Sequence, residues 1–129
     1  MGSMLMTADQ RTIEDSITKI CGQFRDDYWS ECDANARFPE EFYRAMADAG
    51  WLGICMPPEL GGAGLGVTEA AIMMHAVARG GGGYAAASSI HLNIFGPHAI
   101  VVHGTDEQKK RMLVPLIQGK EKACFGVTE

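Results

Sequence analysis

Residues 80–105, GGGGYAAASSIHLNIFGPHAIVVHGT, contain no Asp, Glu, Lys or Arg, although these residue types make up 21% of the chain. A membrane-spanning helix needs roughly 20 consecutive, predominantly apolar residues, and here glycines, serines, histidines and a Gly-Pro pair interrupt the run. We therefore interpret the stretch as the core of a globular fold and predict no membrane span. Residues 84–95 contain good helix formers and no breaker, so we expect a largely buried helix that contacts at least two others. Pro97 then begins a short apolar helix over residues 97–103.

The composition is that of one globular domain. A chain of 129 residues is long enough to bury a core. Its net charge of -5, without a Lys/Arg cluster, argues against nucleic acid and favours small-molecule or protein partners. Residues 1–6 are interpreted as an expression scar and a disordered start. The cysteines show neither CxxC spacing nor closely spaced histidines, so we predict no metal site and reduced core thiols in a cytoplasmic protein: Cys21, Cys32, Cys55 and Cys124.

Two helices are predicted ahead of the first glycine-rich segment. Thr7 and Gln10 match a capping box, and apolar residues then recur at helical spacing, which predicts one helix over residues 8–33. Pro39 is typical of the first turn of a second helix, and Gly50 suits the left-handed residue that follows a helix end.

The segment WLGICMPPELGGAGLG, residues 51–66, has too many glycines and prolines for regular structure and too many apolar residues for a free linker. We predict an ordered loop packed on the core. Neither of the common phosphate-binding glycine patterns is present, so phosphate binding is not favoured. A third helix is predicted over residues 67–78, with an inward face made of Ala71, Met74, Val77 and Ala78.

The last helix and the end of the chain differ in pattern. Thr105 and Gln108 form a second capping box. The helix that follows should be kinked or split by Pro115, and its buried side should consist of Met112, Leu113, Leu116 and Ile117. Residues 122–129 lack helical spacing and are rich in strand-forming types, so we predict a strand. A strand needs a partner, which predicts that a sheet domain follows and that this chain is a fragment.

Three segments taken together resemble one family: residues 50–66, GWLGICMPPELGGAGLG, residues 104–120, GTDEQKKRMLVPLIQGK, and residues 124–129, CFGVTE. They are similar in order and spacing to the N-terminal part of the acyl-CoA dehydrogenase family. The resemblance implies an all-α N-terminal domain over residues 7–121, followed by a β domain whose first strand is residues 122–129. A C-terminal helical domain completes that fold, with FAD and the acyl-CoA thioester held between the domains.

The activity implied by the resemblance is α,β-desaturation of an acyl-CoA in fatty acid metabolism. A base removes the α proton while the β hydrogen leaves as hydride to FAD, which an electron-transfer flavoprotein or a similar acceptor then reoxidises. The family's base is a glutamate of the C-terminal domain, so we assign no catalytic residue here. Glu129 matches a structural position of the strand. The complete enzyme is expected to be a homo-oligomer.

The resemblance also implies two sets of binding residues. The flavin ring is expected to lie along Phe125, Gly126, Val127 and Thr128, although the same residues also suit a plain β-strand. The acyl chain is expected against one face of the helix over residues 84–95, made of Ala87, Ser88, His91 and Phe95. The alternative is that Ser88 and His91 are hydrogen-bonded core groups. A bulky Phe95 and a polar His91 hint at a short, branched or functionalised acyl group.

Other functions share this pattern. Acyl-CoA oxidases and flavin monooxygenases or nitroalkane oxidases of related fold differ in what reoxidises the flavin and in what the cavity holds. A different class is a non-enzymatic helical domain that binds another protein through its apolar faces. A bound flavin in the longer protein would distinguish these classes.

Overall fold

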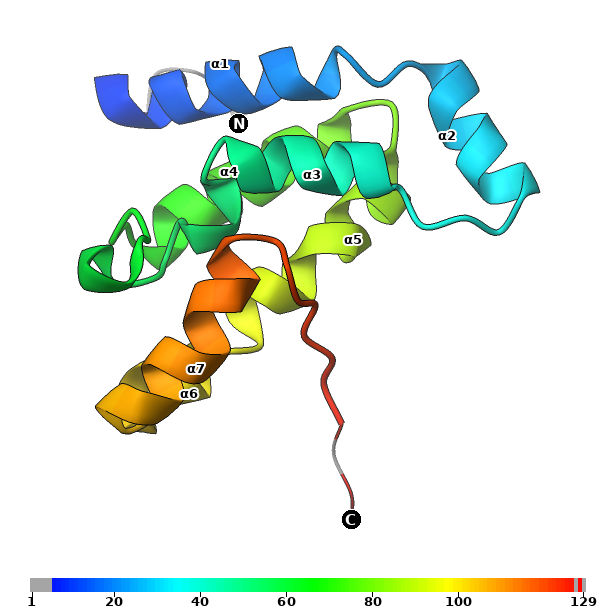
Figure 1. Cartoon of the computed structure of the whole chain (residues 1–129). Helices are drawn as coiled ribbons and strands as arrows, with labels where there is room; N and C mark the ends of the chain where they lie inside the picture. Colours follow the sequence, from blue (N-terminus) through cyan, green and yellow to red (C-terminus); the bar gives the residue numbers. More distant parts are fainter. Residues whose placement is uncertain (1–5, 127, 129) are drawn as a thin grey trace.

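The computed structural model describes residues 6–126 and 128, and all regular structure in these residues is helical. In Figure 1, α1 runs across one end of the body, α3 and α4 lie beside it, α5 lies behind, and α6 and α7 form the opposite end. This confirms the all-α fold class. The expectation for residues 1–6 concerns residues that, apart from Met6, lie outside the described part. The elements are α1 (Ala8–Cys21), α2 (Asp26–Ala34), α3 (Glu40–Asp48), η2 (Trp51–Gly53), η3 (Pro58–Leu60), α4 (Val67–Arg79), α5 (Gly83–Phe95), α6 (His98–His103) and α7 (Asp106–Ile117).

The single helix predicted over residues 8–33 is wrong, because the chain forms two helices with a turn between them. Helix α1 begins at the predicted capping box, in which the Thr7 side chain accepts from the Gln10 amide and the Gln10 side chain accepts from the Thr7 amide. It ends at Cys21, where Gly22, a poor helix former, caps it. The turn is closed by the Trp29 indole N–H, which donates to the Phe24 carbonyl at 3.1 Å.

The turn allows aromatic residues of three elements to pack together. The ring centroid of Phe24 lies 5.5 Å from that of Phe42, and the centroid of Trp29 lies 5.2 Å from it. Both pairs are edge-to-face, a favourable arrangement of two aromatic quadrupoles. A continuous helix would carry Trp29 away from Phe42, so tertiary packing overrides the helical pattern here.

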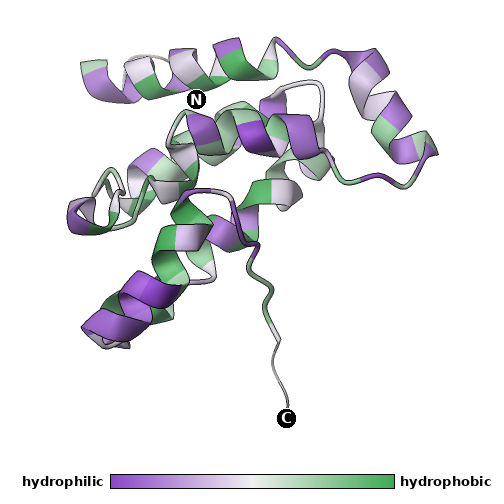
Figure 2. Ribbon diagram, viewed as in Figure 1, coloured by the Kyte–Doolittle hydropathy of each residue, from purple (hydrophilic) through white to green (hydrophobic). Residues whose placement is uncertain are grey.

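The main core lies between α1, α3, α4 and α5, and its apolar side chains are almost fully buried. Helix α1 turns its hydrophobic side toward the rest of the body and its polar side outward, as Figure 2 shows. A second cluster joins the glycine-rich loop to α7 and consists of Met56, Leu113, Leu116 and Ile117. Met112, which was expected with these residues, is only half-buried.

The inward face predicted for the third helix is rotated by about one residue. Of the four expected residues only Val77 is buried, whereas the observed inner face is Ala70, Met73, Ala76 and Val77. This helix is apolar on nearly every side, so its pattern could not select a face. The face is instead set by α1 and α5, which both pack on α4.

The loop over residues 51–66 is ordered and packed on the core, as predicted, and it contains the two short 3₁₀ helices η2 and η3. Leu52, Ile54 and Met56 are buried in it. At Gly62 a Cβ atom would meet the Met56 carbonyl, so no other residue fits there without a backbone shift. Gly50 adopts the expected left-handed conformation, with φ of 83°.

Helix α5 is buried on one side only, which corrects the expectation of a largely buried helix. It packs on α3, α4 and η2, so the expected contacts with other helices are confirmed. The buried side contains Ala86, Ile90, Asn93 and Ile94, while Tyr84 on the other side is 87% exposed. The absence of charge along this helix therefore does not report complete burial.

Gly83–His103 is the one stretch of the described chain that is long and apolar enough to cross a membrane by length and composition, with 28% of its most apolar window buried. Core helices of soluble proteins pass the same test. Here α5 ends at Phe95 and α6 begins at His98, with Gly96 and Pro97 between them. The absence of a membrane span stays a prediction.

Helix α7 continues through Pro115 and is not split. It begins at the predicted capping box of Thr105 and Gln108. The proline lies in the last turn, and the chain leaves that turn through Gly119, whose φ of 67° lies in the left-handed region. Arg44 of α3 donates to the Gln118 and Gly119 carbonyls and so caps this helix end.

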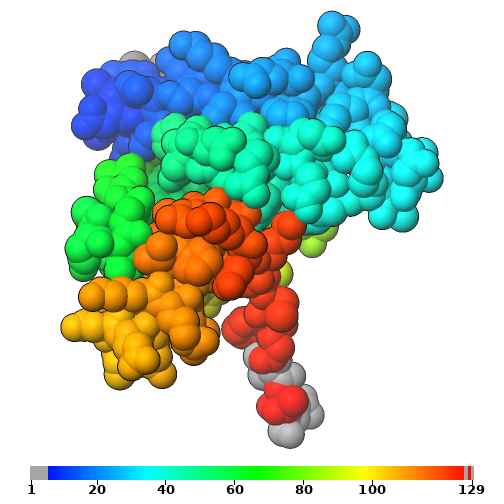
Figure 3. All heavy atoms as spheres, in the orientation of Figure 1, coloured from blue at the N-terminus to red at the C-terminus, as the bar shows by residue number. Residues whose placement is uncertain are grey.

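The strand predicted over residues 122–129 is not formed in the described part, residues 122–126 and 128. Lys122 and Ala123 still contact α3 and α5, and the residues after them leave the helical body (Figure 3). A strand needs a paired neighbour, and the described residues contain none. Residues 121–126 and 128 are called the tail below. Cys124 is exposed there and Cys55 is half-buried, so only Cys21 and Cys32 are the buried thiols expected.

Candidate functional site

The outer side of α5 borders a shallow groove. The groove has a volume of about 310 Å³ and is lined by Met74 of α4 and by Tyr84, Ala87, Ser88, His91 and Leu92 of α5. Three of the four predicted substrate residues, Ala87, Ser88 and His91, are therefore brought together on it. Most of this lining is apolar carbon, with two hydroxyls and one imidazole, the mixture expected of a small-molecule site.

Phe95 is the fourth predicted substrate residue, and it lies beside the groove rather than in its lining. Its ring centroid is 5.3 Å from that of His91, and its side chain is half-buried against the core. Ser88 and His91 are exposed. The alternative that they are hydrogen-bonded core groups is therefore wrong. Phe95 is placed to set the shape of the groove end through its contact with His91.

The predicted flavin residues lie on the exposed tail. Phe125 is 73% exposed, and nothing lies within 4 Å of a Cβ built on Gly126. Thr128 is exposed, and Val127 lies outside the described residues. No hydrogen bond joins Phe125, Gly126 or Thr128 to another described residue. Phe125 offers an aromatic face, Gly126 open backbone and Thr128 a hydroxyl, which are groups compatible with contact to a flavin ring.

A family model for the acyl-CoA dehydrogenase N-terminal domain matches residues 7–120. The chain belongs to the acyl-CoA dehydrogenase family. It is 37% identical over 99 residues to a 3-(aryl)acrylate reductase of Clostridium sporogenes, covering 77% of this chain and 26% of that protein. It is also 30% identical over 124 residues to a short-chain specific acyl-CoA dehydrogenase of Clostridium acetobutylicum, covering 96% of this chain and 32% of that one.

A solved structure, described as the electron transferring flavoprotein of Acidaminococcus fermentans, superposes with a TM-score of 0.85 and 28% sequence identity. It covers 100% of this chain, which corresponds to 33% of the solved chain. The acyl-CoA dehydrogenase domain described here thus spans between a quarter and a third of the relatives it matches.

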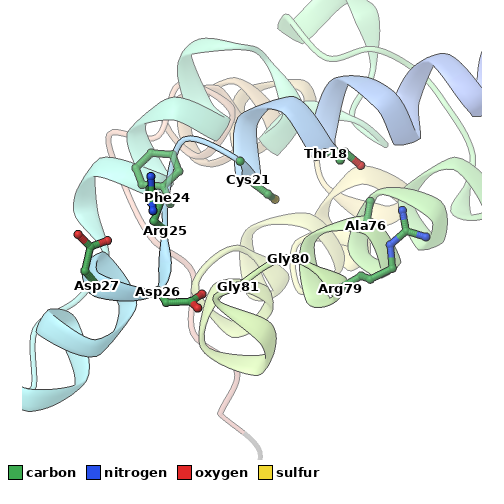
Figure 4. Close-up of a pocket in the computed structure, with 11 residues that line it drawn as sticks. Thr18, Cys21, Phe24, Arg25, Asp26, Asp27, Ala76, Arg79, Gly80 and Gly81 are labelled. Carbon is green, nitrogen blue, oxygen red and sulfur yellow. The ribbon is translucent and has the colours of Figure 1, made fainter.

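A larger hollow lies elsewhere in the described part of this acyl-CoA dehydrogenase domain. It has a volume of about 550 Å³ and lies where the turn from α1 to α2 meets the turn from α4 to α5. Figure 4 shows Arg25 and Arg79 at opposite ends of it, and Asp26 directed at the loop that contains Gly81. Arg79 is 3.5 Å from Glu14, an ion pair. The charges of the hollow do not converge on one point, so it does not form a charged-ligand site.

The strongest electrostatic effects lie at the joint of α2 and α3, away from the groove. Arg37 is hydrogen-bonded to Glu31 and Glu41. The hydrogen bonds from Arg37 lower the pKa of Glu41 to about 2. Burial raises the pKa of Tyr28 to about 12, with smaller effects from Phe42 and Glu41. These hydrogen bonds hold α2 against α3. None of these groups lies in the groove, whose lining contains no Asp, Glu, Lys or Arg.

Three groove residues, Met74, Tyr84 and Leu92, were not predicted as substrate-binding residues from the sequence. Tyr84, Ser88 and Leu92 follow one another at intervals of four, so the helical period would have found Tyr84 and Leu92. Met74 comes from α4, on the side that was expected to face inward, so the wrong face assignment hid it. No group of three or more potential metal ligands exists in the part of the chain that the structure describes.

Proposed function

We propose that this domain is part of an FAD-dependent enzyme that desaturates an acyl-CoA thioester between its α and β carbons. The match to the family over residues 7–120 carries this proposal. It is supported by the uncharged groove on α5, whose residues Ala87, Ser88 and His91 are the ones expected to contact the acyl chain. The groove is open on one side, which leaves room for the remaining domains to close it.

In this proposal the chain has two tasks, and neither is proton abstraction. The outer side of α5 holds and orients the acyl chain, and Phe95 limits the depth of the cavity. The residues from Phe125 to Thr128 lie along the flavin, which supplies the hydride acceptance when bound. The base comes from another part of the enzyme. We further propose an electron-transferring flavoprotein as acceptor, since one relative is named as a subunit of a caffeyl-CoA reductase-Etf complex, and a homo-oligomeric enzyme.

A second candidate is the reverse reaction, reduction of a 2-enoyl thioester or acrylate. It is favoured by the names of two relatives that are each 37% identical, a 3-(aryl)acrylate reductase and an acryloyl-CoA reductase (NADH) of Anaerotignum propionicum. Both directions need the same groove beside the same flavin. They differ in the electron partner, which acts outside this domain.

The test uses the complete enzyme that carries this domain, purified with its flavin. Anaerobic mixing with saturated acyl-CoA thioesters should bleach the oxidised flavin absorption, and mixing the reduced enzyme with enoyl-CoA should restore it. A flavoprotein that exchanges electrons with neither class of thioester would contradict the proposal. The faster direction under the natural electron partner distinguishes the two candidates.

The acyl-chain part of the proposal has its own variant. Phe95→Ala should enlarge the cavity and move the preference toward longer acyl-CoAs, because apolar pockets discriminate by roughly 10- to 200-fold per methylene. An unchanged chain-length profile in that variant would contradict the assignment of Phe95. The chain by itself should be colourless and inactive, because base, substrate and flavin must be held together for reaction.

A further inference from the structure

We propose that Asn93 is a positioning residue, which holds the segment leading into the flavin contacts against the helix that forms the substrate wall. Asn93 is on the inner side of α5 and is 3% exposed. Together with the Tyr43 hydroxyl, its amide forms a small polar site within the otherwise apolar core of the described residues. Its catalytic consequence rests on the proposed function, whereas its structural role can be tested on this chain alone.

All hydrogen-bonding atoms of the Asn93 side chain are used, and two of the three bonds go to the tail. Oδ1 accepts from the Ala123 backbone N–H at 2.8 Å. Nδ2 donates to the Glu121 carbonyl at 3.1 Å and to the Tyr43 hydroxyl at 2.7 Å. A backbone N–H can only donate, so the contact with Ala123 fixes which end of the amide is oxygen.

Helix α3 holds the same segment from the other side. The buried Tyr43 hydroxyl donates to the Glu121 carbonyl at 3.0 Å, and burial raises the pKa of Tyr43, which keeps its proton in place. Lys122 forms an ion pair with Glu40 at 2.8 Å, and its Nζ lies 4.3 Å from the ring centroid of Phe38. The start of the tail is thus fixed between α3 and α5.

The position of Asn93 along the chain explains why this anchor matters. It lies two residues after His91 on the same helix, and Ala123 lies two residues before Phe125. An extended chain advances about 3.3 Å per residue, so Phe125 begins within roughly 7 Å of the anchored amide. Asn93 therefore links the two binding regions directly, although they are far apart in sequence.

Transfer of a hydride requires the reacting atoms about 3 to 3.5 Å apart, and a misplacement of about 1 Å can cost on the order of 100-fold in rate. A tail that leaves the body at a fixed point has fewer conformations available, which helps to meet this requirement. An apolar residue at position 93 would fill the same space in the core. The amide has one acceptor oxygen and two donor hydrogens on separate atoms, so it can accept from Ala123 while donating to both Glu121 and Tyr43.

The first test measures hydrogen exchange of the Ala123 amide in this chain by NMR. In the wild type this amide should be protected, while those of Cys124 and Phe125 exchange freely. Asn93→Ala should speed exchange at Ala123 by roughly tenfold, the loss expected for one hydrogen bond. Asn93→Asp keeps an acceptor and should give an intermediate rate. Exchange at Ala123 as fast as at Phe125 in the wild type would overturn the proposal.

A matched control separates anchoring from general stability. Ile90→Val truncates a fully buried residue of the same helix without touching the tail, so it should lower Tm and leave Ala123 more protected than in Asn93→Ala. Equal loss of protection at Ala123 in both variants, at matched Tm, would show that Asn93 acts only through stability and would overturn the proposal.

The second test uses the complete enzyme. Asn93→Ala should slow flavin reduction by bound substrate by about 10- to 100-fold with little change in KM, and Asn93→Asp should recover part of that loss. Wild-type rates in Asn93→Ala would overturn the positioning role. A wild-type enzyme whose flavin no thioester reduces would contradict the proposed function instead, and the exchange measurement would then decide the anchor by itself.

Discussion

Neither side of helix α5 carries an Asp, Glu, Lys or Arg, but one side is buried and the other is exposed. Ile90 and Ile94 on the inner side are buried against α3, α4 and η2, whereas Tyr84, Ser88 and His91 on the outer side are exposed. An exposed helix side normally carries charged residues. This exposed side lacks them, and it is the side that the proposed function covers with the acyl chain and the remaining domains.

The largest effect should come from the inner side. Ile90→Ala removes a fully buried side chain and should lower the free energy of unfolding by about 2 to 5 kcal/mol, because transfer and cavity costs add. Urea unfolding followed by circular dichroism measures it. A loss below about 1 kcal/mol would show that the inner side is not the core it is described to be.

A smaller effect is expected at the polar part of the inner side. Tyr43→Phe keeps the ring in the core but removes the hydroxyl that joins Asn93 to the Glu121 carbonyl. The loss should be about 0.5 to 1.5 kcal/mol, since Asn93 still donates to Glu121 after the change. Denaturant midpoints measure it, and Tyr84→Phe on the exposed side of α5 serves as the control. Equal losses in the two variants would remove the distinction between the sides.

The outer side should be nearly silent in stability. Ser88→Ala and His91→Ala change exposed side chains and should shift the free energy of unfolding by no more than about 0.5 kcal/mol in either direction. In the complete enzyme the same changes should alter substrate preference. A large loss of stability in the isolated domain would mean that the outer side is structural.

The smallest expected effect is on the pH dependence of the free energy of unfolding. It shows that the stability comparisons above should be made above about pH 5. The pKa of Glu41 falls from 4.5 to about 2 because Arg37 is hydrogen-bonded to the ionised form. The stabilisation is therefore fully present above about pH 5 and is lost as the pH falls through 4.5 toward 2. Glu41→Gln should remove this part of the acid dependence by lowering stability slightly at neutral pH, where Glu41 is ionised, and should change little near pH 2. An unchanged acid limb in Glu41→Gln would contradict the role of this pair.

Local signals in the sequence were sufficient for the starts of α1 and α7 and for the turn that follows α3. The capping boxes at Thr7 and Thr105 and the glycine at residue 50 act through neighbouring backbone groups, and each is found where it was predicted. The turn after Cys21 could not be predicted in this way, because it depends on Trp29 reaching Phe42. The face of α4 could not be predicted either, since the helix is apolar all round and its neighbours choose the side.

The candidate site was predictable in part. Helical spacing together with the family resemblance placed Ala87, Ser88 and His91 on one surface, where the groove is found. Met74 could not be found before the packing of α4 was known. Asn93 is one of few polar residues in an uncharged helix, but its role could not be predicted. Its partners lie at residue 43 and at residues 121–123, and no sequence period connects these positions.

The central claim is that the outer side of α5 forms the wall of the acyl cavity, and filling the groove tests it most directly. Ser88→Phe in the complete, flavin-loaded enzyme is compared with Ser30→Phe, the same change at an exposed position of α2. We predict that Ser88→Phe lowers kcat/KM for the longest accepted acyl-CoA relative to the shortest by roughly tenfold or more per excluded methylene, while Ser30→Phe leaves the profile unchanged. Identical chain-length profiles for Ser88→Phe and the wild type, with full flavin content, would contradict the claim.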